Sequence, residues 1–158
     1  SLVFLRPLGL RLVIEKVDGP SHLKVVEEFG YEMYMHCGAI RKVLLAWQTP
    51  TFIDEYFRTI IIHDQAFPHV RPDDLREELK KIRQDGYAIT RGEYVNDAVG
   101  IGAPVFNSEG ELAGSIGIIA PEIRIGSPEL LETQRDLVQF YASALSSDLG
   151  YEKHDVFQ

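Results

Sequence analysis

The sequence has little cysteine, few basic residues and no long hydrophobic run. Cys37 is its single cysteine among 158 residues, which excludes an intramolecular disulfide and a CxxC-type zinc site and suits a reducing cytoplasm. Its 16 Lys and Arg stand against 24 Asp and Glu, a formal net charge of −8. This acidic balance disfavours binding of nucleic acid or anionic lipid by this chain itself. The longest apolar runs reach about half of the ~20 residues that a membrane span needs, and no signal peptide opens the chain. We therefore expect a soluble protein.

The length fits one domain. A chain of about 150 residues buries roughly two-thirds of the surface that it exposes when unfolded, which is enough for a single core. We expect this domain to span residues 1–150 and residues 151–158 to form a C-terminal tail. Because the chain begins at Ser1 in a strand-like stretch, without a Met, we also expect it to be a fragment of a longer protein.

The periodicity of apolar residues predicts a mixed fold. Alternating patterns predict strands over residues 2–8, 10–17, 22–26, 87–93, 98–106 and 111–120. Helical spacing and capping residues predict helices that begin near Gly38, at Thr49-Pro50, at Pro72 and at Ser127-Pro128, the last two ending at Gly86 and Gly150. Since the strands are joined by short hairpins with helices between groups of them, we expect an α+β domain with helices packed on an antiparallel sheet.

The hairpin over residues 98–120 is short of side chains. One face of its first strand has Val99, Ile101, Ala103 and Val105, whereas the other has Ala98, Gly100, Gly102 and Pro104. Each interior glycine costs roughly 0.5–1 kcal/mol relative to alanine. Either a helix, such as the one that begins at Ser127, approaches the sheet closely, or the bare face is the floor of a small-molecule pocket.

The first helix begins with small residues, from Cys37 to Ile40. The backbone N–H groups of its first turn are therefore accessible and carry the positive end of the helix dipole. A carboxylate ligand can bind there without a basic side chain, although every helix has such an end.

Several separate motifs resemble one family. They are MHCGAIRKVLLA at 35–46, LREELKKIRQDGY at 75–87, Gly92-Glu93, and VGIGAPVFNSEGELAGSIGIIAP at 99–121. In this order, and over nearly the whole chain, they resemble the effector-binding domain of IclR-type transcriptional regulators. The resemblance implies a GAF-like antiparallel sheet flanked by helices, with an effector pocket on one sheet face. It also implies a homodimer or tetramer that contacts DNA only through an N-terminal winged helix-turn-helix domain, which this chain lacks.

The resemblance also implies a set of pocket residues. Carried over by position, they are His22, Val25, Met33, Ala39, Ile40, Thr90, Ala98, Gly100, Gly117 and Ile119. We add His36, Cys37, Gly38 and Glu93 to this candidate effector-binding set. Family members that bind very small acids carry hydroxyl, thiol or carboxylate groups where this chain has Thr90, Gly100, Gly117 and Ile119. We therefore expect a roomier, less polar pocket, and an organic acid larger than a two- or three-carbon oxoacid, with aromatic acids among the candidates.

Other chemistry is less well supported by the sequence. Cys37 beside His36 suggests a nucleophile, but no orienting acid is marked nearby. His63, Asp64 and His69, or His36 with Glu93, lack the spacing of a zinc motif. We expect no catalytic residue, no metal and no cofactor.

Two polar segments can be interpreted from their composition. Residues 91–97 form either a solvated turn or a lid over the effector. The charged helix face over residues 76–83 is interpreted as solvated surface with weak i, i+4 pairs.

The sequence thus favours an effector-sensing and oligomerisation domain of a bacterial IclR-type regulator, without catalysis. Two alternatives stay open: a GAF-like enzyme that uses Cys37, and a dimerisation module without a ligand.

Overall fold

The computed structural model of the chain describes residues 2–5, 10–15, 17–18, 20, 32–61 and 70–153. Six strands form one antiparallel sheet in the order β3-β2-β1-β6-β5-β4. The strands are β1 (Leu2–Leu5), β2 (Leu10–Glu15), β3 (Glu32–Tyr34), β4 (Ala88–Arg91), β5 (Ala98–Phe106) and β6 (Leu112–Pro121). The helices are α1 (Ala39–Ala46), α2 (Pro50–Thr59), α3 (Pro72–Asp85), α4 (Glu122–Ile125) and α5 (Pro128–Asp148). The predicted α+β class is confirmed.

The predicted caps form. Thr49 caps α2 and Ser127 caps α5, each through a side chain that accepts a hydrogen bond from the backbone three residues on, and a proline follows each cap. Gly86 ends α3 in the left-handed conformation, with φ of 78°. Local sequence therefore sets most of the helix boundaries.

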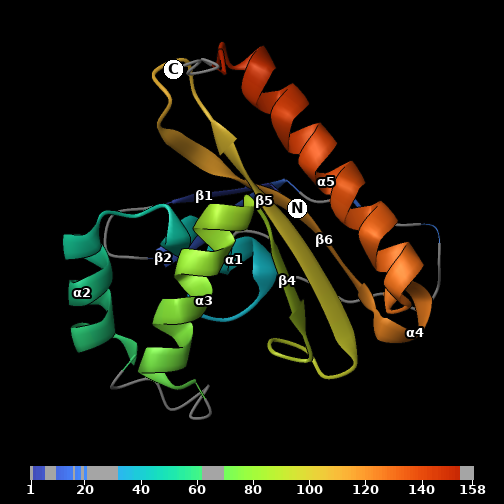
Figure 1. Cartoon of the computed structure of the whole chain (residues 1–158), viewed down its shortest axis with the longest axis horizontal. Helices are drawn as coiled ribbons and strands as arrows, with labels where there is room; N and C mark the ends of the chain where they lie inside the picture. The colour runs from blue at the N-terminus through green and yellow to red at the C-terminus, as the bar shows by residue number, and fades with distance from the viewer. Residues whose placement is uncertain are drawn as a thin grey trace.

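Helices cover both faces of the sheet (Figure 1). On one face, α5 packs against the side chains of β5 that the alternating pattern assigned to the core, in a cluster with Ile125, Val138 and Ala142. On the other face lies α1, every residue of which is buried, and α3 packs against α1 from outside. The glycine-rich face of β5 is therefore the face that α1 covers.

This close approach explains two glycines. A Cβ atom on Gly102 would lie 2.8 Å from the Cα of Ile40, and one on Gly117 would clash with the Ile101 carbonyl oxygen of β5 and lie 2.5 Å from Cγ1 of Ile40. Real Cβ atoms do not come so close. At Gly102 the backbone of a helix excludes a side chain, whereas at Gly117 the backbone of β5 and the Ile40 side chain together exclude one. The helix is α1, whereas the sequence suggested the helix at Ser127.

Some elements differ from the prediction. Residues 32–34 form a short strand that the alternating pattern did not predict, and the four-residue α4 was not predicted either. Strand β4 ends at Arg91 instead of Glu93, because Gly92 takes a φ of 61° and the chain turns away. The predicted strand over 22–26 lies outside the described residues.

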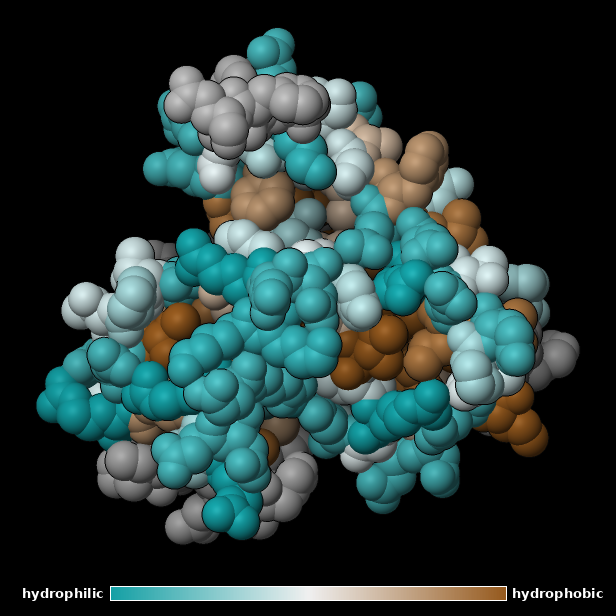
Figure 2. Space-filling model, in the orientation of Figure 1, coloured by the Kyte–Doolittle hydropathy of each residue, from teal (hydrophilic) through white to brown (hydrophobic). Residues whose placement is uncertain are grey.

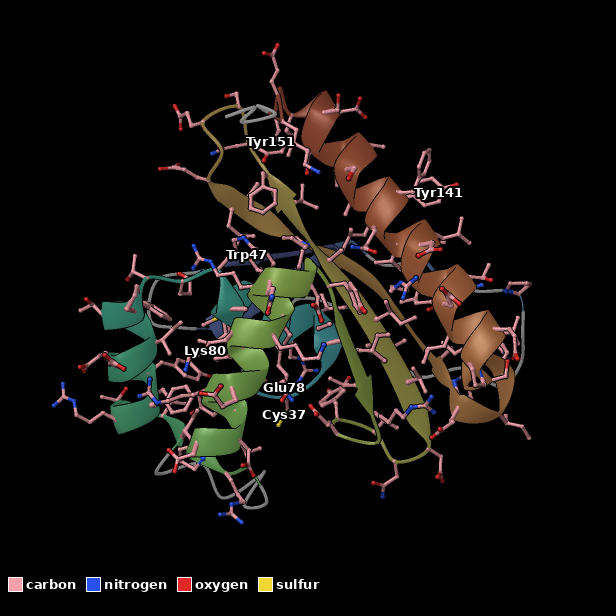
Figure 3. All side chains as sticks on the ribbon, viewed as in Figure 1. Cys37, Trp47, Glu78, Lys80, Tyr141 and Tyr151 are labelled. Atoms are coloured by element: carbon pink, nitrogen blue, oxygen red, sulfur yellow. The ribbon has the colours of Figure 1, made fainter. Side chains whose placement is uncertain are left out.

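The end of α5 is followed by a packed residue. The Tyr151 ring lies 5.2 Å from that of Phe106, which in turn lies 6.0 Å from that of Trp47. Figure 3 shows Tyr151 near the end of α5 and Trp47 nearer the middle of the molecule. The expected tail thus begins with a residue that packs on the domain.

Candidate functional site

The candidate site is built around the first turn of α1. Gly38 is its N-cap, with a φ of 87°, a conformation that favours glycine. The Gly38 N–H donates a hydrogen bond to Oε2 of Glu93 at 3.1 Å, and the Ala39 N–H donates one to Oγ1 of Thr90 at 3.0 Å. The sequence predicted that these amides are free to bind an anion. Instead, the Gly38 N–H is bound by the Glu93 carboxylate and the Ala39 N–H by the Thr90 hydroxyl.

A buried lysine completes the polar contacts at this end of the helix. Only 4% of the Lys42 side chain is exposed, and its Nζ lies 2.6 Å from Oε1 of Glu93 and 2.7 Å from Oε2 of Glu78. Glu93 thus bridges the Gly38 N–H and the Lys42 ammonium with its two oxygens. Because a buried cation needs an anionic partner, both carboxylates stabilise the charge of Lys42.

Glu78 corrects the interpretation of the charged face on α3. The surface over α3 is hydrophilic (Figure 2), and Lys80 pairs there with Glu77, three residues before it in the sequence. Glu78, by contrast, reaches from α3 to the buried Lys42 of α1. In the sequence, this buried ion pair is indicated only by two adjacent cations, Arg41 and Lys42, within an otherwise apolar helix.

The segment over residues 92–97 lies between β4 and β5, and part of it covers the start of α1. The Arg41 guanidinium carbon lies 3.6 Å from the centre of the Tyr94 ring, within cation–π distance, and Glu93 contacts Gly38 as described. Asn96 and Asp97 are exposed. Glu93 and Tyr94 therefore cover the start of α1, whereas Asn96 and Asp97 belong to a solvated turn.

A small cavity lies beneath this cover. Its volume is about 20 Å³, room for a single water molecule. It is lined by Gly38, Ala39, Ile40, Arg41, Thr90, Glu93, Tyr94, Val95, Ala98, Gly100 and Ile119. Eight of these belong to the candidate effector-binding set, and the set missed Arg41, Tyr94 and Val95. The cavity is smaller than expected, since Glu93 and Tyr94 fold over it.

Other members of the candidate set lie elsewhere or outside the described residues. Gly117 packs under Ile40 and is not among the cavity-lining residues. His36 and Cys37 are each 1% exposed, and His36 Nδ1 lies 2.8 Å from the Tyr56 hydroxyl. The backbone of Met33 lies in β3. His22 and Val25 lie outside the described residues.

The described part of the chain shows no group of three or more His, Cys, Asp and Glu side chains that could hold a metal ion. His63, Asp64 and His69 lie outside that part. Among the helices described, none is long and apolar enough to cross a membrane.

A known protein family matches most of the chain. Residues 10–147 match the family described as "Bacterial transcriptional regulator IclR C-terminal". The chain therefore belongs to the IclR family and carries its C-terminal domain, as the motifs indicated.

Individual relatives agree with this assignment. The chain is 30% identical over 144 residues to the HTH-type transcriptional regulator RhmR of Escherichia coli, a match that covers 90% of this chain and 53% of RhmR. It is 27% identical to KipR of Bacillus subtilis, also named an HTH-type transcriptional regulator, with 89% and 56% covered. The chain thus spans about half the length of these relatives.

Solved structures show the same fold. The crystal structure of Thermotoga maritima IclR superposes with a TM-score of 0.84 at 25% identity, covering 95% of this chain and 60% of that one. The repressor BlcR of Agobacterium tumefaciens superposes with a TM-score of 0.81 at 23% identity, covering 96% and 60%.

Proposed function

We propose that this domain senses a small organic acid and oligomerises, and that it thereby modulates DNA binding by an IclR-type regulator. The observation that carries the proposal is the carboxylate of Glu93 on the Gly38 N–H, 3.1 Å away. This contact supports the proposal, because a carboxylate of the chain itself already accepts a hydrogen bond from the start of α1. The effector's carboxylate binds at Gly38 to Ile40, and its body lies toward Gly100 and Ile119.

The residues that line the cavity indicate which kind of organic acid binds as the effector. Ala98, Gly100 and Ile119 offer apolar or bare surface, which suits an apolar body better than a second polar group. A cavity of about 20 Å³ does not hold an aromatic acid, so the cover at Glu93 and Tyr94 moves when such a ligand enters. The remaining members of the candidate set, His22, Val25, Met33, His36, Cys37 and Gly117, stay predictions as effector contacts.

The proposed mechanism is a population shift. An effector that binds one arrangement of the domains better favours that arrangement, and a coupling of about 1–3 kcal/mol changes operator affinity roughly 5- to 150-fold. DNA is contacted by a domain outside residues 1–158, in a homodimer or tetramer acting in the cytoplasm. The domain at 1–150 works by binding alone, without a cofactor or a catalytic residue.

A thermal-shift screen with glyoxylate, pyruvate and benzoate tests the proposal. A ligand at a hundred times its Kd adds about 2.7 kcal/mol to the free energy of unfolding. We expect benzoate-like acids to stabilise the domain more than the oxoacids do. Tight binding of pyruvate or glyoxylate without binding of benzoate overturns the preference for larger acids.

One observation favours a second candidate, the dimerisation module without a ligand. Helix α1 already fills the space over Gly102 and Gly117. If a broad panel of organic acids leaves the melting temperature unchanged, this candidate replaces the sensor.

A further inference from the structure

We propose that Glu93 is an internal ligand of the effector site, which the effector's carboxylate displaces. This inference rests on the proposed function, and it reverses the role that the sequence suggested for Glu93. Instead of helping to bind the effector, Glu93 competes with it.

The geometry gives Glu93 the position that an effector carboxylate needs. Its Oε2 accepts from the Gly38 N–H at 3.1 Å and its Oε1 lies 2.6 Å from Lys42 Nζ. Both donors are fixed by α1, one as its N-cap and one a turn further on, and Lys42 is buried. A carboxylate from outside that takes the same place makes both contacts, and charge-assisted bonds of this kind are the strong ones.

The charges around Lys42 favour replacement of the Glu93 carboxylate over addition of a third carboxylate. Lys42 is one cation between two carboxylates, those of Glu78 and Glu93. A third carboxylate beside them adds like-charge repulsion at a poorly solvated position. Replacing Glu93 leaves the number of charges around Lys42 unchanged, because Glu78 remains in place from α3.

Displacing Glu93 releases a segment that also contacts the other side of the sheet. At the far end of residues 92–97, the Asp97 carbonyl accepts a hydrogen bond from the Glu122 N–H at 2.7 Å. Arg91, just before the segment, pairs with Glu122 and donates to the Gly126 carbonyl at 3.2 Å. The Glu122 carboxylate and the Gly126 carbonyl both lie at α4, which leads into α5. Exchange at α1 therefore changes a segment that is bonded to α4, the helix that follows β6.

Chemical rescue with acetate tests the exchange directly. Glu93→Ala removes the internal carboxylate, and we expect its melting temperature to fall and then to rise saturably with acetate, compared with equal concentrations of chloride. Glu78→Ala is the matched control, because it also vacates a place beside Lys42 but not beside the Gly38 N–H. We expect its rise to be several times smaller. No rise in Glu93→Ala, or equal rises in both variants, overturns the proposal.

A second pair of variants tests competition without removing the side chain. Glu93→Gln abolishes the negative charge that competes, so we expect it to bind benzoate about tenfold more tightly than the wild type does. We expect Glu78→Gln to bind within about twofold of the wild type. Unchanged or weaker binding by Glu93→Gln shows that Glu93 does not compete. If wild type and both glutamine variants bind no acid, while Glu93→Ala takes up acetate, the sensing function fails and the exchangeable position stands.

Discussion

At the scale of single residues, the glycines of β5 differ in which atoms a side chain at each position would contact. A Cβ on Gly102 meets backbone atoms of Ile40 at 2.8 and 2.9 Å, whereas one on Gly100 meets Thr90 Oγ1 at 3.1 Å and the Ala39 Cβ at 3.4 Å. Backbone cannot yield as a side chain can. We expect Gly102→Ala to lower the free energy of unfolding by about 1–3 kcal/mol and Gly100→Ala to lower it less, as measured by urea denaturation. Equal losses would contradict the account of α1 packing.

Thr90 offers a second test at this scale. It is 6% exposed, and its hydroxyl accepts the Ala39 N–H. Thr90→Val keeps the shape but leaves that buried N–H without its acceptor, so we expect a loss of about 1–3 kcal/mol in unfolding free energy. Thr90→Ser keeps the oxygen and should lose clearly less. If valine and serine are equivalent, the hydrogen bond at the helix start contributes nothing measurable.

At the scale of elements, the pair between Lys42 and Glu78 links α1 to α3. Because Lys42 is buried, we expect Glu78→Gln to cost about 1–2 kcal/mol of stability. Glu77→Gln, on the same helix, breaks only an exposed pair with Lys80 and should change stability by less than about 0.5 kcal/mol. Denaturant titration of the two variants compares them. Equal effects would mean that the bridge does not stabilise the α1–α3 contact.

Elements with a strong local signal were predicted well from the sequence. The bounds of β5, the caps of α2, α3 and α5, and the core side of the hairpin all follow from turn chemistry and alternation. The three-residue β3 and the four-residue α4 are too short for a period to show.

Contacts between distant segments could not be predicted in this way. Which helix covers Gly102 and which acid pairs with Lys42 depend on tertiary packing, since the partners are 36 or more residues apart. Eight of the cavity-lining residues were thus predicted from the sequence, whereas the hydrogen bond from the Gly38 N–H to Glu93 depends on tertiary packing.

At the scale of the whole molecule, self-association is part of the proposed function. Helix α5 exposes Leu130, Leu137, Phe140 and Tyr141, and hydrophobic residues gather on its side of the molecule (Figure 2). Tyr141 points away from the sheet (Figure 3). We expect light scattering to give a dimer or tetramer of the 17.9 kDa chain. A monomer at micromolar concentration would contradict the oligomerisation that we propose.

The central claim is that a carboxylate ligand binds at the start of α1. Titration of the isotope-labelled domain with benzoate, followed through the backbone amide resonances, tests it most directly. The account predicts that the Gly38 and Ala39 amides shift saturably and among the most strongly, together with the amide of Glu93 as it is displaced. Saturable shifts confined to other parts of the chain, with Gly38 and Ala39 unmoved, would contradict it.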